Sequence, residues 1–283
     1  MKRILILVIS LGIFGLDLFR QAVRRAIGRR GAPSTIVLAY HSVSRNERKA
    51  FAKQMDQLLR YAKPCRADAP AAQSALDRYV AVTFDDGYKT LLDYAIPELA
   101  ERNIPATIFV VTGVLGMAPN WQDYSGGTDC AMSETLMTVE QLRAISSDLI
   151  QIGSHTLSHP MLPLLPEDEV RRELLVSRIV LEEILSQKVN LFSFPYGAFD
   201  PKLISLCRDA GYVRAFITHP RALDHQNDEF AVSRIKADPH DWPLEFYLKL
   251  HGAYRWRNKW HFRFRSESVP SVLTVRKNLQ ATE

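Results

Sequence analysis

Short β-branched runs alternate with helix-like segments along most of this 283-residue chain. The runs predict strands that end near residues 41, 84, 111, 154, 194, 218 and 235. The segments between them predict helices over 51–61, 91–102, 139–149, 167–185 and 201–210. Such an alternation is typical of a parallel sheet or barrel with its helices outside. We therefore predict a single α/β barrel domain whose functional residues follow the carboxyl ends of the strands.

Two adjacent carboxylates, Asp85 and Asp86, come directly after the buried run 80–84. Alternate side chains of a strand point to opposite faces, so both acids serve one cavity only if the strand ends there, and Gly87 permits that bend. Unshielded carboxylates repel each other, and a bound metal ion relieves the repulsion. With 31 acidic residues, roughly three acidic pairs are expected by chance. The place of this pair after a strand distinguishes it from pairs such as Glu182-Glu183 and Asp228-Glu229, which fit a helix surface and a polar loop.

Histidines follow two of the predicted strands. His41 comes after the run 35–40, where the carboxyl end of a strand opens into a cleft. His155 and His159 follow the run 150–154, and a spacing of four places both imidazoles on one side of a helical turn. Such a pair commonly gives two ligands to one metal ion. The alternative is two surface histidines behind a helix that begins at Ser154.

One carboxylate and two histidines form the donor set of a hydrolytic zinc site that keeps an open position for water. Asp86, His155 and His159 are the candidate ligands. Asp85 then remains free to take a proton from that water as general base.

In this order, the motifs strongly resemble those of the polysaccharide deacetylases, the NodB-like family 4 carbohydrate esterases. The Thr-Phe-Asp-Asp-Gly and His-Thr-x-x-His motifs of that family stand here at 83–87 and 155–159, and the resemblance covers roughly 36–250. It implies a distorted (β/α) barrel that removes acetyl groups from N-acetylated amino sugars of a polysaccharide or glycan. It also implies a divalent metal ion, with Zn²⁺ as the first expectation.

The resemblance also implies roles for individual residues. By it, Asp85 is the base, and the metal ligands are Asp86, His155 and His159. The backbone N–H of Tyr196, after Pro195, helps to stabilise the tetrahedral oxyanion, and Pro195 belongs to the substrate-binding segment. A preorganised donor of this kind contributes about 3 kcal/mol in comparable sites.

The sequence departs from this family at two points. The acid histidine of the family usually follows a late Leu-x-His strand, whereas Leu250 and His251 follow a predicted helix here. We expect His41 to be the acid, because a strand at the front resembles that of circularly permuted members; His251 and His219 are the alternatives. Ser193 stands where many members carry an arginine that orients the base, and the sequence does not show what replaces it.

Two further stretches are candidates for contact with substrate. A long glycine-containing segment follows the third predicted strand, and loops of this length are usually functional or disordered. Trp121 within it suggests a cover over a sugar-sized site, so we assign it to substrate binding. Asp238, Asp241 and Trp242 resemble the late Asp-Trp motif of the family.

Both ends of the chain combine basic and apolar residues. The apolar run 4–16 is shorter than the ~20 residues that span a bilayer, and a basic amphipathic pattern follows it. We expect 1–33 to be a membrane-associating or signal-anchor segment, 34–252 the catalytic domain, and 253–283 a basic aromatic tail. A membrane surface is therefore an expected partner, and nucleic acid is not, because no nucleic-acid motif is present. The expected location is at a membrane of the cell envelope, on a side that the sequence leaves open.

Two other functions stay open at this stage. The chain could be a deacetylase-like glycan-binding module without turnover, as the loss of arginine at Ser193 suggests, or it could hydrolyse O-acetyl groups or another ester or peptide. The sequence names neither the sugar, the polymer nor the oligomeric state. Cys65, Cys130 and Cys207 lack metal-site spacing and are interpreted as free thiols.

Overall fold

The computed structural model describes residues 2–28, 34–69, 78–119, 121, 134–218 and 230–257. All pairings between its named strands are parallel. The strands are β1 (Ser34–Tyr40), β2 (Lys63–Pro64), β3 (Arg78–Phe84), β4 (Ala106–Val110), β5 (Ile150–Ser154), β6 (Leu191–Ser193), β7 (Arg214–Ile217) and β8 (Ala231–Lys236).

The sheet closes on itself through its first strand. β1 pairs with β3 along its whole length and with β8 on its other side, so that seven strands form a ring. β2 pairs with the first half of β3, on the edge that β4 uses further along. Sequence neighbours from β3 to β8 also lie side by side. The predicted (β/α) barrel is confirmed, and the carboxyl ends of its strands meet at one edge.

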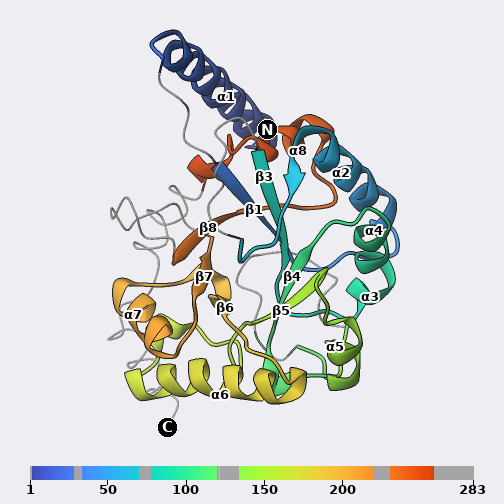
Figure 1. The fold of residues 1–283 in the computed structure, drawn as a ribbon, viewed down its shortest axis with the longest axis vertical. Helices are drawn as coiled ribbons and strands as arrows, with labels where there is room; N and C mark the ends of the chain where they lie inside the picture. The colour runs from blue at the N-terminus through green and yellow to red at the C-terminus, as the bar shows by residue number, and fades with distance from the viewer. Residues whose placement is uncertain are drawn as a thin grey trace.

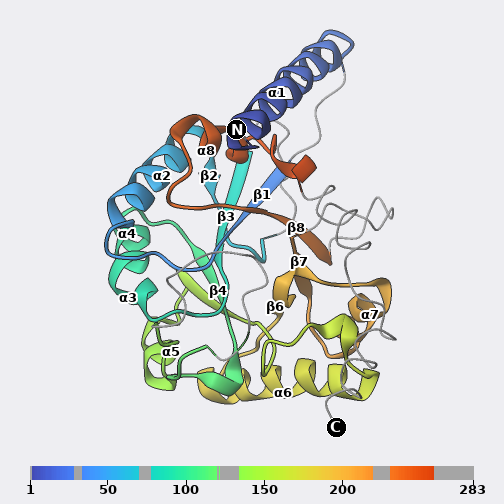
Figure 2. The same cartoon turned by 180° about the vertical axis from the view of Figure 1, so that it is seen from behind.

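Helices surround this barrel (Figure 1 and, from behind, Figure 2). They are α1 (Lys2–Ala26), α2 (Arg48–Tyr61), α3 (Thr90–Tyr94), α4 (Ile96–Glu101), α5 (Val139–Ile145), α6 (Glu167–Leu185), α7 (Pro201–Asp209) and α8 (Pro243–Leu250). Short 3₁₀ turns lie at η1 (Thr112–Val114), η2 (Leu162–Leu164) and η3 (Pro195–Gly197).

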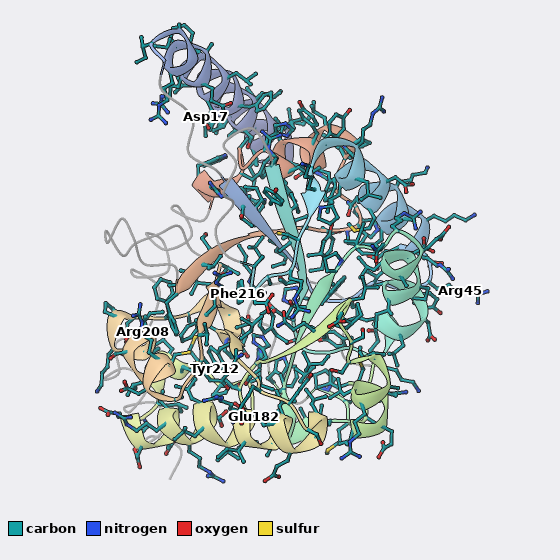
Figure 3. The ribbon with its side chains drawn as sticks, in the orientation of Figure 1. Asp17, Arg45, Glu182, Arg208, Tyr212 and Phe216 are labelled. Atoms are coloured by element: carbon teal, nitrogen blue, oxygen red, sulfur yellow. The ribbon has the colours of Figure 1, made fainter. Side chains whose placement is uncertain are left out.

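Successive side chains of each strand point alternately out of and into the barrel, and this divides the core into two parts. Outward side chains such as Val80 and Val82 pack against the helices in the larger cluster. Inward side chains form a smaller cluster that includes Ala81, Phe109 and Phe216. Figure 3 shows Phe216 in the interior of the fold. The interior is therefore lined by apolar groups, and a charge inside it needs a partner there.

Two predicted helices differ from the structure. The helix expected over 91–102 is two short helices, α3 and α4, because Pro97 in the first turn of α4 has no N–H to continue the ladder of α3. The helix expected over 139–149 ends at Ile145, and its start is fixed by a capping box between Thr138 and Gln141.

The N-terminal segment forms one continuous helix. The apolar run was expected to be too short to span a bilayer, yet α1 passes through Gly12, Gly15 and Asp17 without a break. Among the described residues, 2–24 is the one stretch that is long and apolar enough for a membrane span. The first half of α1 lies beside α8, and the second half projects beyond the rest of the fold (Figures 1 and 2).

Candidate metal and catalytic site

The two carboxylates lie where β3 ends. Asp85 continues the inward alternation of Ala81 and Thr83, and its N–H donates to the carbonyl of Tyr40 on β1 at 2.9 Å. Asp86 has a φ of 71° and Gly87 a φ of 85°, so the backbone turns sharply here. A Cβ on Gly87 would lie 2.7 Å from Cγ1 of Val110. The strand therefore ends where the sequence predicted, and both aspartates are buried.

The two histidines lie on a loop after β5, and the expectation of a helical turn is wrong. Thr156 and His159 have φ values of 72° and 59°, which a helical turn excludes. The Thr156 hydroxyl accepts the N–H of His159 at 3.0 Å and thereby holds the turn. The imidazoles of His155 and His159 nevertheless converge, with their ring centroids 4.9 Å apart.

Asp86, His155 and His159 bring their donor atoms within 4.8 Å of one another in a buried group. Oδ1 of Asp86 lies 3.6 Å from Nε2 of His155 and 3.5 Å from Nε2 of His159. Two ligands at the usual zinc bond length and a tetrahedral angle lie about 3.3 Å apart, so this spacing suits one ion. The donor set therefore fits a divalent metal ion.

The Nδ1 atoms of both imidazoles also have polar partners. Nδ1 of His155 donates to the carbonyl of Ser193 at 2.8 Å, which leaves Nε2 as the lone-pair atom that faces Asp86. Nδ1 of His159 lies 3.2 Å from the Tyr196 hydroxyl. Burial lowers the pKa of both histidines, so their rings are neutral at pH 7, as metal ligation requires.

Asp85 is held by Arg234, a residue of β8 that the sequence analysis did not single out. The guanidinium donates from Nη1 to Oδ1 and from Nη2 to Oδ2, both at 2.7 Å. Ser193 joins the pair, because its hydroxyl accepts from Arg234 at 2.7 Å and donates to Asp85 at 3.2 Å. Arg234 is fully buried between the rings of Phe109 and Phe216. An arginine from a different strand thus contacts both Asp85 and the serine that stands in the usual arginine position.

This ion pair sets the charge of Asp85. Burial alone would raise the pKa of Asp85, but the charge of Arg234 and its hydrogen bonds hold that pKa well below the usual range. The carboxylate is therefore ionised at neutral pH, and it lies close enough to His155 for their charges to interact.

His41 follows β1 directly, and its side chain is exposed. Desolvation lowers the pKa of His41 to about 4, and the charge of Asp85 opposes this lowering. The charges of Asp85 and His155 both act on His41, which places it beside the site. The alternative acid His251 lies elsewhere, because its ring packs against Phe14 of α1 at a centroid distance of 5.1 Å. His219 lies outside the described residues.

Trp121 and the Pro195–Gly197 turn flank the donor set. Trp121 stacks on the ring of His159 with centroids 4.4 Å apart. Tyr196 has a φ of 57° and its ring meets His159 edge-on at 4.7 Å. Both aromatic side chains therefore contact His159 from different segments.

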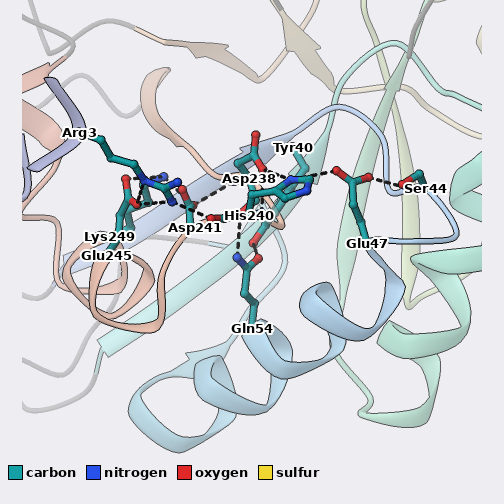
Figure 4. Close-up of polar contacts among 10 residues, drawn as sticks. All are labelled: Arg3, Tyr40, Ser44, Glu47, Gln54, Asp238, His240, Asp241, Glu245 and Lys249. Carbon is teal, nitrogen blue, oxygen red and sulfur yellow. Dashed lines mark hydrogen bonds and ion pairs between the residues drawn. The ribbon is translucent and has the colours of Figure 1, made fainter. Parts of the chain in front are cut away.

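The late Asp-Trp residues contact other parts of the protein (Figure 4). Asp241 accepts from Lys249 of α8 at 2.5 Å, and Asp238 accepts from His240. The carbonyl of Asp238 is bound by Gln54 of α2, which in turn accepts from the hydroxyl of Tyr40. These residues therefore tie the segment after β8 to α2 and α8.

Glu173 of α6 supports the histidine loop. Its Oε2 accepts the N–H groups of Leu157 and Ser158, both at 2.9 Å, and its Oε1 accepts the Ser158 hydroxyl at 2.6 Å. The loop needs such support because two of its residues have left-handed backbone conformations. Glu173 is therefore a positioning residue for His159.

Replacing Glu173 by Ala is expected to weaken zinc binding by about 10–100-fold, as loss of such support does in metal sites. Glu173→Gln should recover most of the affinity, because its amide oxygen still accepts from both N–H groups and the Ser158 hydroxyl can turn to accept. Competition with a chelating dye measures the affinity, and Glu169→Ala, on an exposed position of the same helix, is the control. Unchanged affinity in Glu173→Ala would exclude the positioning role.

Arg234 and Glu173 differ in whether the sequence could have indicated them. Arg234 stands inside the apolar strand pattern 231–235, and a charge there implies a buried carboxylate partner. Glu173 is one of several acids on an amphipathic helix, and nothing in the sequence distinguishes it from the exposed ones.

Comparisons with known proteins cover most of the barrel. A model of the family described as polysaccharide deacetylase matches residues 72–215. The Bacillus subtilis protein YxkH, whose name assigns it provisionally to that family, is 25% identical over 214 residues, 72% of this chain and 71% of that protein. The poly-beta-1,6-N-acetyl-D-glucosamine N-deacetylase of Staphylococcus aureus is 23% identical over 159 residues, 56% of this chain and 54% of that protein. The solved structure of IcaB from Ammonifex degensii matches with a TM-score of 0.61 and 25% identity, covering 78% of this chain and 98% of that one.

Proposed function

Because the chain belongs to the polysaccharide deacetylase family, we propose that it removes acetyl groups from N-acetylated amino sugars of a polysaccharide in a reaction that needs a divalent metal ion. Members of this family hydrolyse amide carbon–nitrogen bonds, and this chain is a hydrolase of that class. The observation that carries the proposal is the buried Asp86, His155 and His159 group beside a carboxylate held by Arg234.

Asp86, His155 and His159 would hold the metal ion, and Zn²⁺ suits their donor set best. When bound there, the ion would act as a Lewis acid toward the acetyl carbonyl and make water more acidic. Other divalent ions accept the same ligands, so cellular supply also decides which one is bound.

Asp85 is the proposed general base. Its ionised carboxylate takes a proton from the attacking water as the new carbon–oxygen bond forms. Arg234 and Ser193 fix the orientation of both carboxylate oxygens, so that little reorganisation is needed when the proton moves. The charge of Arg234 also keeps Asp85 ionised.

The collapse of the tetrahedral intermediate breaks the carbon–nitrogen bond and needs a proton for the amine. We assign the transfer of that proton to His41, whose neutral imidazole lies beside Asp85: it takes up the proton that Asp85 removed from water and passes it to the amine. The backbone N–H of Tyr196 is the proposed donor to the oxyanion, and Trp121 and Pro195 are the proposed substrate contacts. Acetate and the free amino sugar are the products.

The substrate is proposed by analogy with the relatives. Two curated relatives are named as deacetylases of poly-β-1,6-N-acetylglucosamine and of chitin. A polymer of N-acetylated hexosamine is therefore the first substrate to test. Residues 1–33 would hold the enzyme at a membrane of the cell envelope, where such polymers are accessible.

Acetate release by the full chain in mild detergent tests the function. N-acetylglucosamine oligomers are expected to give acetate, a chelator should stop the release, and added Zn²⁺ should restore it. An O-acetylated glycan offered in parallel separates de-N-acetylation from ester hydrolysis. Release from the O-acetylated glycan alone would replace the proposal by an O-deacetylase. Binding of a metal ion and of glycan without any release would leave a binding module.

A further inference from the structure

One side of α1 is built into the catalytic domain. The docked side repeats at helical spacing and consists of Arg3, Ile6, Leu7, Ser10 and Phe14. Ser10 is fully buried and accepts the indole N–H of Trp256 at 3.0 Å. Phe14 meets the ring of Tyr247 edge-on at 5.7 Å. The first half of the helix is therefore a packed element of the fold.

A charged network lies directly under this docked half (Figure 4). Arg3 donates twice to Glu245 of α8, at 3.0 and 2.8 Å, and its guanidinium covers the ring of Trp242 at 4.4 Å. Glu245 is buried and lies 4.0 Å from Lys249, which binds Asp241. A helix that crossed a bilayer in this position would carry these charges into the hydrocarbon, at a cost of several kcal/mol.

The opposite side of α1 is apolar and exposed along its whole length. It includes Leu5, Val8, Leu16, Phe19 and Val23, each with about two fifths or more of its surface free. At 100° per residue, this free face is centred about 170° from the docked side.

The projecting half of α1 keeps the same two sides. Asp17, Gln21 and Arg24 continue the line of the docked side, so that side changes from packed to polar where the helix leaves the domain. Arg20 lies between the two sides and pairs with Asp17. Arg20 and Arg24 are exposed and suit anionic headgroups. An apolar face opposite a polar one is the pattern of a helix that lies in a membrane interface.

We infer that α1 lies in the plane of the membrane interface as a retained part of the enzyme, with its free face in one leaflet and the barrel held on the aqueous side. The partner is a lipid bilayer rich in anionic lipid. α1 is long enough to span a bilayer. Its docking to α8 excludes a spanning arrangement for as long as the contacts of Arg3 and Ser10 persist. The inference concerns this surface alone and holds or fails independently of the catalytic assignments.

Depth-dependent fluorescence quenching tests the inference on the full chain in vesicles that contain anionic phospholipid. Single cysteines at Val8, Phe19 and Gln21 carry an environment-sensitive dye in a Cys65→Ser, Cys130→Ser background, while buried Cys207 stays unlabelled. Lipid-borne quenchers should report the same shallow depth for the dyes at positions 8 and 19, and they should not quench the dye at position 21. A depth difference of about 16 Å, the axial rise over eleven residues, would establish a span and overturn the inference. Absence of quenching at both positions would equally overturn it.

Vesicle flotation gives a second, independent test. Phe19→Asp places a charge on the free face and is expected to reduce binding about tenfold, since an immersed aromatic side chain contributes at least about 1.5 kcal/mol. Gln21→Asp adds the same charge on the polar side and should float as the unsubstituted chain does in zwitterionic vesicles. Equal loss in both variants would contradict the assigned free face.

Discussion

Asp85→Asn is expected to lower kcat for acetate release by about a thousandfold while the metal ion stays bound. The amide keeps the shape of the carboxylate but cannot take the proton of the attacking water, and general bases contribute about 10²–10⁴ in rate. Arg234 and Ser193 can still donate to its side-chain oxygen, but the buried guanidinium loses its counter-ion, so the variant should be less stable while it stays folded. Acetate release and metal content, measured on the same sample, give both quantities.

Asp86→Asn is the matched control for this experiment. It makes the same chemical change one residue along the chain, but it removes a charge from the donor set and should lower the metal content itself. The two variants thus separate base from ligand by their metal content. Asp85→Asn with near-normal kcat would reject Asp85 as the base, and metal loss in Asp85→Asn would assign it to the donor set.

Arg234→Met is expected to destabilise the protein by about 3–5 kcal/mol, because it leaves the Asp85 carboxylate buried without its counter-ion. For a domain of this size, the loss corresponds to a fall in Tm of roughly 10 °C. The same change removes the charge that lowers the pKa of Asp85, so that pKa rises. The acid limb of the kcat/KM profile should therefore move to higher pH in whatever folded enzyme remains.

A double-mutant cycle identifies the cause of this loss. In Asp85→Asn with Arg234→Met, no buried carboxylate is left, so the free energy of unfolding should exceed that of Arg234→Met alone. Arg178→Met, which removes an arginine that bonds backbone carbonyls near α7, is a control for the loss of a partly buried guanidinium. Strictly additive effects at Asp85 and Arg234 would show that the pair does not interact energetically.

The parts of the site that lie next to strand ends could be predicted from the sequence. Asp85 and Asp86 follow an unbroken β-branched run, and the alternation of a strand leaves few places for two acids in one cavity. The barrel could likewise be predicted, because each β-branched run is too short to be a helix and a helix-like segment follows it. Local pattern and global fold agree at these positions.

The contacts that cross the barrel could not be predicted in this way. The pairing of Arg234 with Asp85 depends on β8 lying across the ring from β3, and no local pattern records which inward side chains meet. The conformation of the histidine loop depends on Glu173, a helix residue fourteen positions after His159. The length of α1 was underestimated because only the apolar run 4–16 was counted, whereas one helix continues from that run through the basic amphipathic stretch after it.

The pairing of the first strand with the last affects how this protein can fold during its synthesis on the ribosome. Val37 lies opposite Arg234, about 200 residues later in the chain, so the ring cannot close until nearly all of it has been synthesised. Until then, Asp85 has no counter-ion and the edges of β1 and β7 are uncovered. Nascent chains that stop short of β8 therefore offer open strand edges to which other chains can pair.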